Sequence, residues 1–148
     1  MNGRIGLDTN VLARYYVEPA PDNPAEHRQC EAARQLVESG QRLSVCKTVL
    51  LELEWVLRGY YDYPPAQIVL AFAHLLAQPQ IEVEDRTRVE QAVRNYVSGL
   101  DFADALHHAS YADCQQVASF DDRGFARRSR KLGLAPPVVL PDKGRGRS

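Results

Sequence analysis

The chain has 148 residues, which is enough for one domain with a hydrophobic core of its own. Hydrophobic residues make up 45% of it and charged residues 25%, as in an ordinary globular protein. The formal net charge of −1 excludes a protein that grips nucleic acid through bulk positive charge. If nucleic acid is the substrate, local basic patches or metal ions must handle the phosphates.

Cysteine usage and hydropathy indicate the compartment. Cys30, Cys46 and Cys114 are odd in number and show no Cys-x-x-Cys spacing. This pattern argues against a disulfide framework and against a zinc site, and it predicts reduced thiols. The N-terminus shows no apolar run of a signal peptide, and no stretch approaches membrane-spanning length. We therefore expect a cytoplasmic protein without a membrane segment.

Predicted strands alternate with predicted helices along the chain. Short apolar runs predict strands over residues 5–7, 42–46, 81–83, 116–119 and 136–140. Apolar residues at helical spacing predict helices over residues 11–16, 25–39, 48–61, 65–77, 85–98, 101–112 and 125–132. This alternation predicts an α/β fold with a short, mostly parallel central sheet and helices on both faces. We expect a single domain over residues 1–141, followed by a flexible basic tail over residues 142–148.

Four acidic residues stand at the ends of predicted strands or in the first turns of predicted helices. They are Asp8, Glu52, Asp104 and Asp121. A single such residue is usually only a helix cap, but strand-to-helix junctions of a parallel sheet gather along one edge, so these carboxylates are expected to converge. Crowded carboxylates need a cation, and oxygen ligands without His or Cys favour Mg²⁺ or Mn²⁺ over Zn²⁺. The pattern predicts metal-assisted hydrolysis of phosphodiester bonds.

Four motifs around these acids resemble a known family. They are GLDTNVL at residues 6–12, TVLLELEWVL at 48–57, FADAL at 102–106 and ASFD at 118–121. In this order and at this spacing they resemble the PIN-domain ribonucleases, and they look most like the VapC-type toxins of bacterial toxin–antitoxin pairs. The resemblance covers nearly the whole chain and implies a PIN-like three-layer fold.

The resemblance also implies a role for each matching residue. The four acids would form the catalytic site, with Asp8 and Asp104 as the main metal ligands and the other two completing the shell or orienting waters. Thr9 and Ser119 match positions where the family places a hydroxyl beside the acids. Asn10 would tie the first turn together.

The activity implied by the resemblance is that of an Mg²⁺- or Mn²⁺-dependent endoribonuclease toxin. Its cognate antitoxin would cover the site with a C-terminal segment, and the toxin would form a homodimer. Two alternatives stay open. One is a PIN-type nuclease of RNA processing or repair without an antitoxin. The other is a non-catalytic RNA-binding PIN module, although the presence of all four acids disfavours it.

Other acidic residues near the site have simpler interpretations. Asp101 lies one turn before Asp104 and is predicted to be the helix N-cap rather than a member of the site. Asp122 is interpreted as a turn residue. Glu54 lies about 200° around the helix from Glu52, which predicts a position on the solvated face.

Histidines and aromatic residues also lie near the acids. His107 and His108 follow Asp104, and packing or a surface hydrogen bond is favoured over a general-base role because a metal-bound water needs no His base. Four aromatic residues at helical spacing are interpreted as core or partner-facing rather than base-stacking. They are Trp55, Tyr60, Tyr61 and Tyr63.

A cluster of basic residues follows Asp121. Its members are Arg123, Arg127, Arg128, Arg130 and Lys131. A solvated basic face and contact with an RNA backbone are equally open interpretations. The first three arginines are the candidates for RNA-backbone contact.

Overall fold

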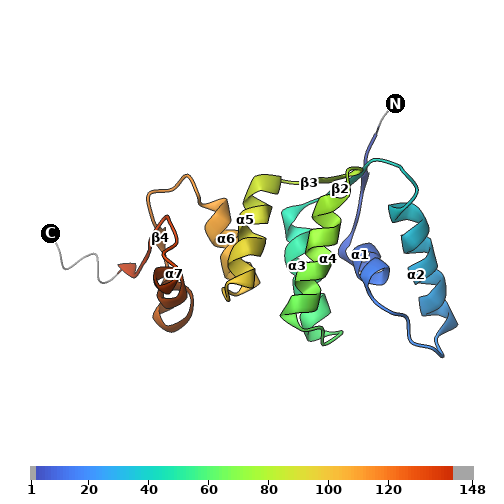
Figure 1. Cartoon of the computed structure of the whole chain (residues 1–148), viewed down its shortest axis with the longest axis horizontal. Coiled ribbons are helices and arrows are strands. Elements are labelled where there is room, and N and C mark those ends of the chain that lie inside the picture. Colours follow the sequence, from blue (N-terminus) through green and yellow to red (C-terminus); the bar gives the residue numbers. More distant parts are fainter. Residues whose placement is uncertain (1–2, 142–148) are drawn as a thin grey trace. The chain divides into compact units, whose positions relative to one another are not determined.

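The computed structural model describes residues 3–141 (Figure 1). It is a mixed α/β structure with short parallel strands, which confirms the predicted fold class. The chain divides into two compact units, one up to Arg86 and one from Thr87 onward. The single-domain interpretation stays a prediction, and the predicted basic tail over residues 142–148 lies outside the described residues.

The first unit contains a parallel sheet of three strands in the order β1-β2-β3. The strands are β1 (Ile5–Gly6), β2 (Leu43–Val45) and β3 (Ile81–Val83). In the register of this sheet, Leu43 of the central strand lies between Ile5 and Ile81. The apolar side chains of β2 and β3 are buried, which is why these short runs form strands despite their length.

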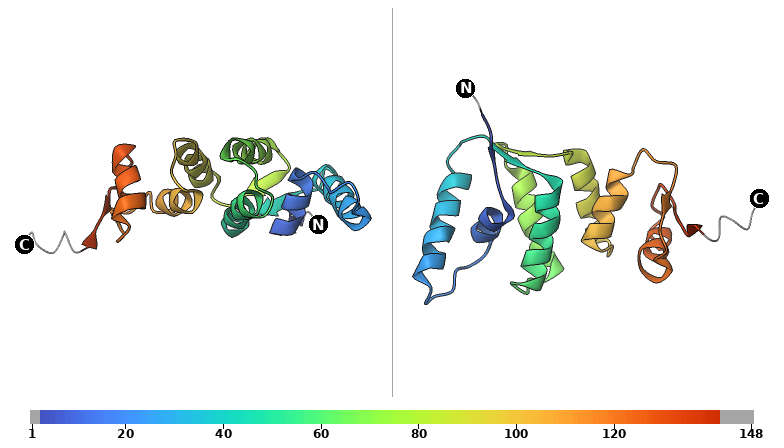
Figure 2. Two further views of the ribbon diagram at one scale, coloured as in Figure 1. Left: turned by 90° about the horizontal axis from the view of Figure 1, so that it is seen from below. Right: turned by 180° about the vertical axis from the view of Figure 1, so that it is seen from behind.

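Four helices belong to the first unit. They are α1 (Thr9–Tyr16), α2 (Pro24–Val37), α3 (Lys47–Gly59) and α4 (Pro65–Ala77). Helix α1 packs against α2 and α3, and α3 and α4 lie side by side in the views of Figures 1 and 2. The start of α2 follows from its cap, because the Asn23 side chain accepts a 3.0 Å hydrogen bond from the Glu26 amide and Pro24 opens the first turn.

The second unit contains helices, a two-stranded sheet and one π-helical turn. Its elements are α5 (Arg86–Val97), α6 (Phe102–Ser110), β4 (Val117–Ala118), η1 (Asp122–Ala126), α7 (Arg127–Lys131) and β5 (Val138–Val139). Strands β4 and β5 pair in parallel, which confirms the strand predicted last in the chain. The predicted final helix begins earlier than expected, because Ala126 donates to the carbonyl of Asp121 five residues back and forms the π turn.

The structure overturns one prediction on α3 and narrows another. Glu54, predicted to be solvated, is 3% exposed, because it lies on the same inner stripe as Leu50, Leu53 and Leu57. The negative charge of Glu54 is balanced by Arg58, which lies one helical turn later. Arg58 Nε is 2.8 Å from Glu54 Oε2. Trp55 was interpreted as core or partner-facing; it is 62% exposed, so it is not a core residue and the partner-facing alternative stays a prediction.

The cysteines and helix lengths agree with the sequence. Cys30, Cys46 and Cys114 are free thiols, as predicted. Within residues 3–141, none of the helices combines the length and apolar character that a membrane crossing needs.

Candidate functional site

The first acidic residue is held at the junction of β1 and α1. Leu7 is buried, and its amide donates a 2.9 Å hydrogen bond to the carbonyl of Ser44 on β2. The next residue, Asp8, caps α1, and its carboxylate accepts a 2.8 Å hydrogen bond from the Thr9 amide. Asp8 itself is exposed. Its carboxylate is therefore oriented by the helix terminus while it stays accessible to a ligand.

A buried hydroxyl connects this turn to α3. Thr9 is 5% exposed, and its Oγ1 donates a 2.5 Å hydrogen bond to Oε1 of Glu52. Glu52 lies on the exposed side of α3, about one and a half turns into the helix. The structure therefore brings together three of the predicted site residues: Asp8, Thr9 and Glu52.

A pocket of about 340 Å³ opens beside these residues. Both carboxylates line one part of it and aromatic side chains line another. The lining residues are Asp8, Thr9, Asn10, Ala13, Arg14, Glu52, Trp55, Val56, Tyr60 and Tyr61. Arg14 was not predicted from the sequence. Its Nε donates to Gln29 Oε1 at 2.8 Å and its Nη1 donates to the Tyr61 hydroxyl, so the guanidinium is held in place.

In the second unit, Asp104 lies in the first turn of α6. Asp101 is the N-cap of this helix, as predicted, and its carboxylate accepts a 3.2 Å hydrogen bond from the Asp104 amide. Partial burial raises the pKa of Asp104, and the negative charges of Asp101 and Asp121 raise it further. The positive charges of His107 and Arg128 oppose this shift. Asp104 and Asp121 thus influence each other, which places two predicted site residues in one electrostatic environment.

The orientation of Asp121 is fixed by its own loop. Its amide donates to Ser119 Oγ at 3.1 Å, and its carboxylate accepts from the Gly124 amide at 2.9 Å. A Cβ atom at Gly124 would lie 2.7 Å from Asp121 Oδ2, so a side chain there would displace the carboxylate. Gly124 therefore belongs to the candidate site, although sequence reasoning missed it. The Asp-Asp-Arg-Gly run is the turn signal that marks it.

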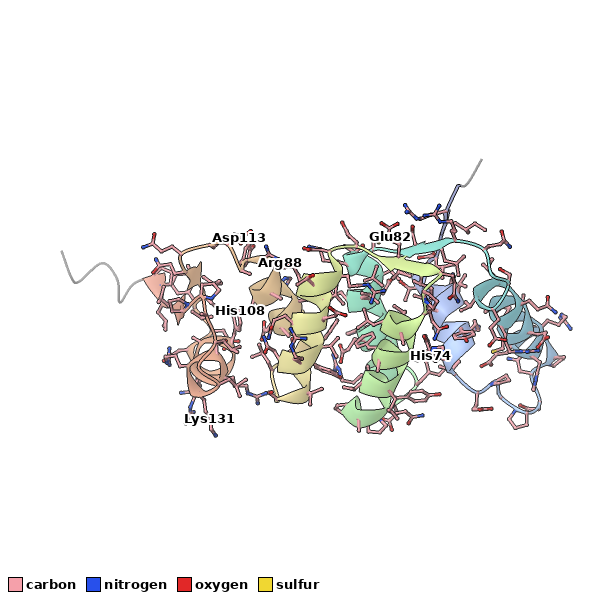
Figure 3. All side chains as sticks on the ribbon, turned by 45° about the horizontal axis from the view of Figure 1, so that its top comes forward. His74, Glu82, Arg88, His108, Asp113 and Lys131 are labelled. Atoms are coloured by element: carbon pink, nitrogen blue, oxygen red, sulfur yellow. The ribbon has the colours of Figure 1, made fainter. Side chains whose placement is uncertain are left out.

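Neighbouring residues of the second unit settle several interpretations. His108 is 3% exposed and its Nε2 lies 2.8 Å from the Pro136 carbonyl oxygen, so the packing interpretation is confirmed (Figure 3). Asp122 lies in the π turn and its Oδ1 accepts from Arg130 Nη2 at 3.2 Å. Arg128 donates from Nη1 to the Gly99 carbonyl at 3.0 Å.

The basic surface of the second unit lies on η1 and α7. Arg123 and Arg127 are exposed, and Lys131 projects from the end of α7 (Figure 3). The sequence-derived candidates for contact with an RNA backbone are Arg123, Arg127 and Arg128, and all three are exposed.

The PIN domain family model matches residues 5–131 of the chain. The chain belongs to the PIN domain family. PIN domains are generally nucleases, so this membership indicates a hydrolase that acts on nucleic acid. None of the curated proteins compared with the chain matches it.

PIN domains typically use divalent metal ions, and the donors present here have the matching chemistry. The acids predicted for this PIN domain are hard oxygen donors, the type that Mg²⁺ and Mn²⁺ prefer. The pKa of Asp104 is raised first by burial and then by the negative charges of Asp101 and Asp121, and a bound cation would favour the ionised form of this acid. Within residues 3–141, however, no group of three or more His, Cys, Asp or Glu side chains is arranged to hold a metal ion.

Proposed function

We propose that this PIN domain is an Mg²⁺- or Mn²⁺-dependent endoribonuclease that acts as the toxin of a toxin–antitoxin pair. The observation that carries the proposal is the position of the four candidate carboxylates at or within two turns of helix starts. Thr9 connects two of them: its amide donates to Asp8, which caps α1, and its hydroxyl donates to Glu52. The pKa of Asp104 in α6 is raised chiefly by burial and further by the charges of Asp101 and Asp121.

We assign Asp8 and Asp104 as the main metal ligands, with Glu52 and Asp121 completing the shell or orienting water. When bound, the cation would supply an activated water and neutralise a phosphoryl oxygen. The protein's own residues hold the carboxylates in place. The Thr9 hydroxyl donates a hydrogen bond to Glu52, and Ser119 Oγ accepts a hydrogen bond from the Asp121 amide. Asn10, which lines the pocket beside Asp8, is assigned to the stability of the first turn.

We assign Arg123, Arg127 and Arg128 to contact with the RNA backbone. The three are exposed, and Arg128 is near enough to Asp104 for its positive charge to oppose part of the rise in the pKa of that acid. A guanidinium suits phosphate because its donors form a planar fork. Truncation of one of these arginines should weaken RNA binding for all sequences alike and reduce its salt dependence.

The toxin assignment rests on the resemblance of the four motifs to VapC-type proteins. An antitoxin that places a basic side chain among the carboxylates would neutralise their charge and exclude the cation. We propose that the toxin is a homodimer that associates with such an antitoxin in the cytoplasm. Co-purification from the native operon, followed by light scattering, tests this part. Isolation of a fully active protein without a partner would contradict it.

The nuclease assignment is tested by cleavage of single-stranded RNA. We expect cleavage with Mg²⁺ or Mn²⁺, and a rate at least about 100-fold lower for Asp8→Asn or Asp104→Asn, because each removes a charge that binds metal. Asp22→Asn is the matched control, since Asp22 is an exposed acid outside the candidate site. Full activity in EDTA, or in the Asp8→Asn protein, would refute the assignment.

A further inference from the structure

An acid and exposed aromatic rings line one pocket beside α3. Glu52 and Trp55 lie on α3, three residues apart, and Tyr60 is the C-cap residue that follows the helix. A helix rises by 1.5 Å per residue, so Trp55 stands roughly 4.5 Å and Tyr60 roughly 12 Å along the axis from Glu52. The pocket therefore has a carboxylate end and an aromatic end, carried by α3 and the turn that follows it.

The aromatic end is not required by the core. Trp55 is 62% exposed and Tyr60 is 78% exposed, whereas the inner stripe of α3 is filled by leucines. Large rings left in water beside an acidic site are typical of surfaces that bind a ligand.

The rings are part of an ordered surface. Tyr60 and Tyr61 pack edge to face, with ring centroids 4.8 Å apart. The Tyr61 hydroxyl accepts from Arg14, which Gln29 holds from the other side. A ligand would therefore meet positioned aromatic and guanidinium groups, and little conformational entropy would be lost when it binds.

We propose that Trp55, Tyr60 and Tyr61, the α3 aromatic wall, form a subsite that stacks on a base of single-stranded RNA. The base would belong to a nucleotide next to the phosphate held at the acidic end, so the inference rests on the proposed nuclease function. The wall then selects unpaired RNA, because a base inside a duplex cannot present its face to a side chain.

The composition of the pocket favours a nucleotide over an apolar peptide. Its aliphatic lining consists of Ala13 and Val56, whereas two carboxylates, a guanidinium and three rings supply most of its chemistry. A volume of about 340 Å³ suits one nucleotide rather than a helix of a partner protein. An RNA strand offers both a π face for the rings and a phosphate for a cation held by the acids.

Trp55 is the single tryptophan of the chain, so its fluorescence reports on the wall directly. The probes are single-stranded decaribonucleotides of each base and an abasic oligomer of the same length. They are added to the wild-type protein in EDTA and to the Asp8→Asn protein in Mg²⁺. We expect no cleavage of the probes under either condition. We expect base-containing strands to quench the fluorescence and the abasic strand to leave it unchanged. Equal quenching by both strands, or none by either, would overturn the subsite.

Variants give a second readout, because the exposed rings can be replaced without disturbing the core. Trp55→Ala and Tyr60→Ala should each lower kcat/KM on single-stranded RNA at least about 10-fold and alter the cleavage sites, and Trp55→Phe should recover part of the loss. Tyr111→Ala is the matched control, since Tyr111 is 49% exposed and does not line the pocket. Unchanged rates and sites in both ring variants would overturn the subsite.

The outcomes separate this inference from the nuclease assignment. Quenching by RNA without metal-dependent cleavage would support the subsite and refute the nuclease. Cleavage without quenching would refute the subsite and leave the nuclease standing. Quenching by a co-purifying protein but not by RNA would make the wall a protein interface and overturn the subsite.

Discussion

The Thr9 hydroxyl at the start of α1 donates a 2.5 Å hydrogen bond to the Glu52 carboxylate of α3, 43 residues away in the sequence. One buried side chain thereby sets the position of an acid on another helix. Hydrogen bonds to charged groups are stronger than neutral ones, which makes this contact important for both stability and geometry.

Thr9→Val should show the importance of this bond. The substitution keeps the branched shape and removes the hydroxyl, so the free energy of unfolding should fall by about 1–2 kcal/mol. Glu52 is exposed and regains water, which limits the loss. Urea denaturation measures the change, and Thr9→Ser, which keeps the hydroxyl, should retain more RNA cleavage than Thr9→Val. Equal stability and activity for Thr9→Val and the wild type would show that the bond contributes nothing.

Asp104 should make the metal-free protein less stable as pH rises. Its pKa when folded lies above its ordinary value of 3.8, chiefly through burial, so the folded state holds a proton that the unfolded state has lost. Stability contributed by that proton is lost as pH rises from the ordinary value through the folded value. Asp104→Asn should remove this slope and match or exceed the wild type at neutral pH. Urea denaturation in EDTA across this range measures both proteins.

Divalent metal should favour the stability of the wild type over that of Asp104→Asn, which is the opposite of the order expected in EDTA. Mg²⁺ should stabilise the wild type by mass action and stabilise Asp104→Asn much less, because one ligand charge is gone. Thermal melts with EDTA and with excess Mg²⁺ make the comparison. A clear loss of stability for Asp104→Asn in EDTA, with no response of either protein to Mg²⁺, would identify Asp104 as a structural residue.

Arg58→Ala tests the buried carboxylate on α3. The Glu54 side chain is 4% exposed and the pair is separated by 2.8 Å, so loss of the guanidinium should lower the free energy of unfolding by about 1–3 kcal/mol. Arg34→Ala is the control, because Arg34 and Glu31 form a pair of similar spacing in which both side chains are largely exposed. That variant should change stability little. Equal effects in the two variants would mean that the burial of Glu54 is unimportant.

Gly124→Ala should displace the Asp121 carboxylate without removing it. The new methyl group would lie 2.7 Å from Asp121 Oδ2, so the carboxylate must move. We expect RNA cleavage to fall at least about 10-fold while the melting temperature changes little. Gly6→Ala is the control, since a Cβ at Gly6 meets nothing within 4 Å. Full activity of Gly124→Ala would remove Asp121 from the list of metal ligands.

The sequence was sufficient where a local pattern decides the structure. Periodic apolar residues predicted the parallel α/β class and the late strand β5, because burial of those residues stabilises each element. The cap at Asp101 was also predictable, since capping needs only a short acceptor before the first turn.

Other features depend on contacts that a linear pattern does not contain. Glu54 was predicted to be solvated from its angle to Glu52, but its burial is decided by the leucine stripe and by Arg58 one turn later. The contact of Gly124 with Asp121 depends on a side-chain rotamer, which the sequence does not specify. The placement of all four acids in one site stays a prediction.

Strand β2 is the common support of the first two acids. Leu7, just before Asp8, is bonded to Ser44 of β2 at 2.9 Å, and the helix that carries Glu52 begins directly after the same strand. Collective motions of this strand therefore displace both carboxylates together and preserve the spacing between them. Thermal motion of β2 should therefore change the position of each acid more than it changes the distance between the Asp8 and Glu52 carboxylates.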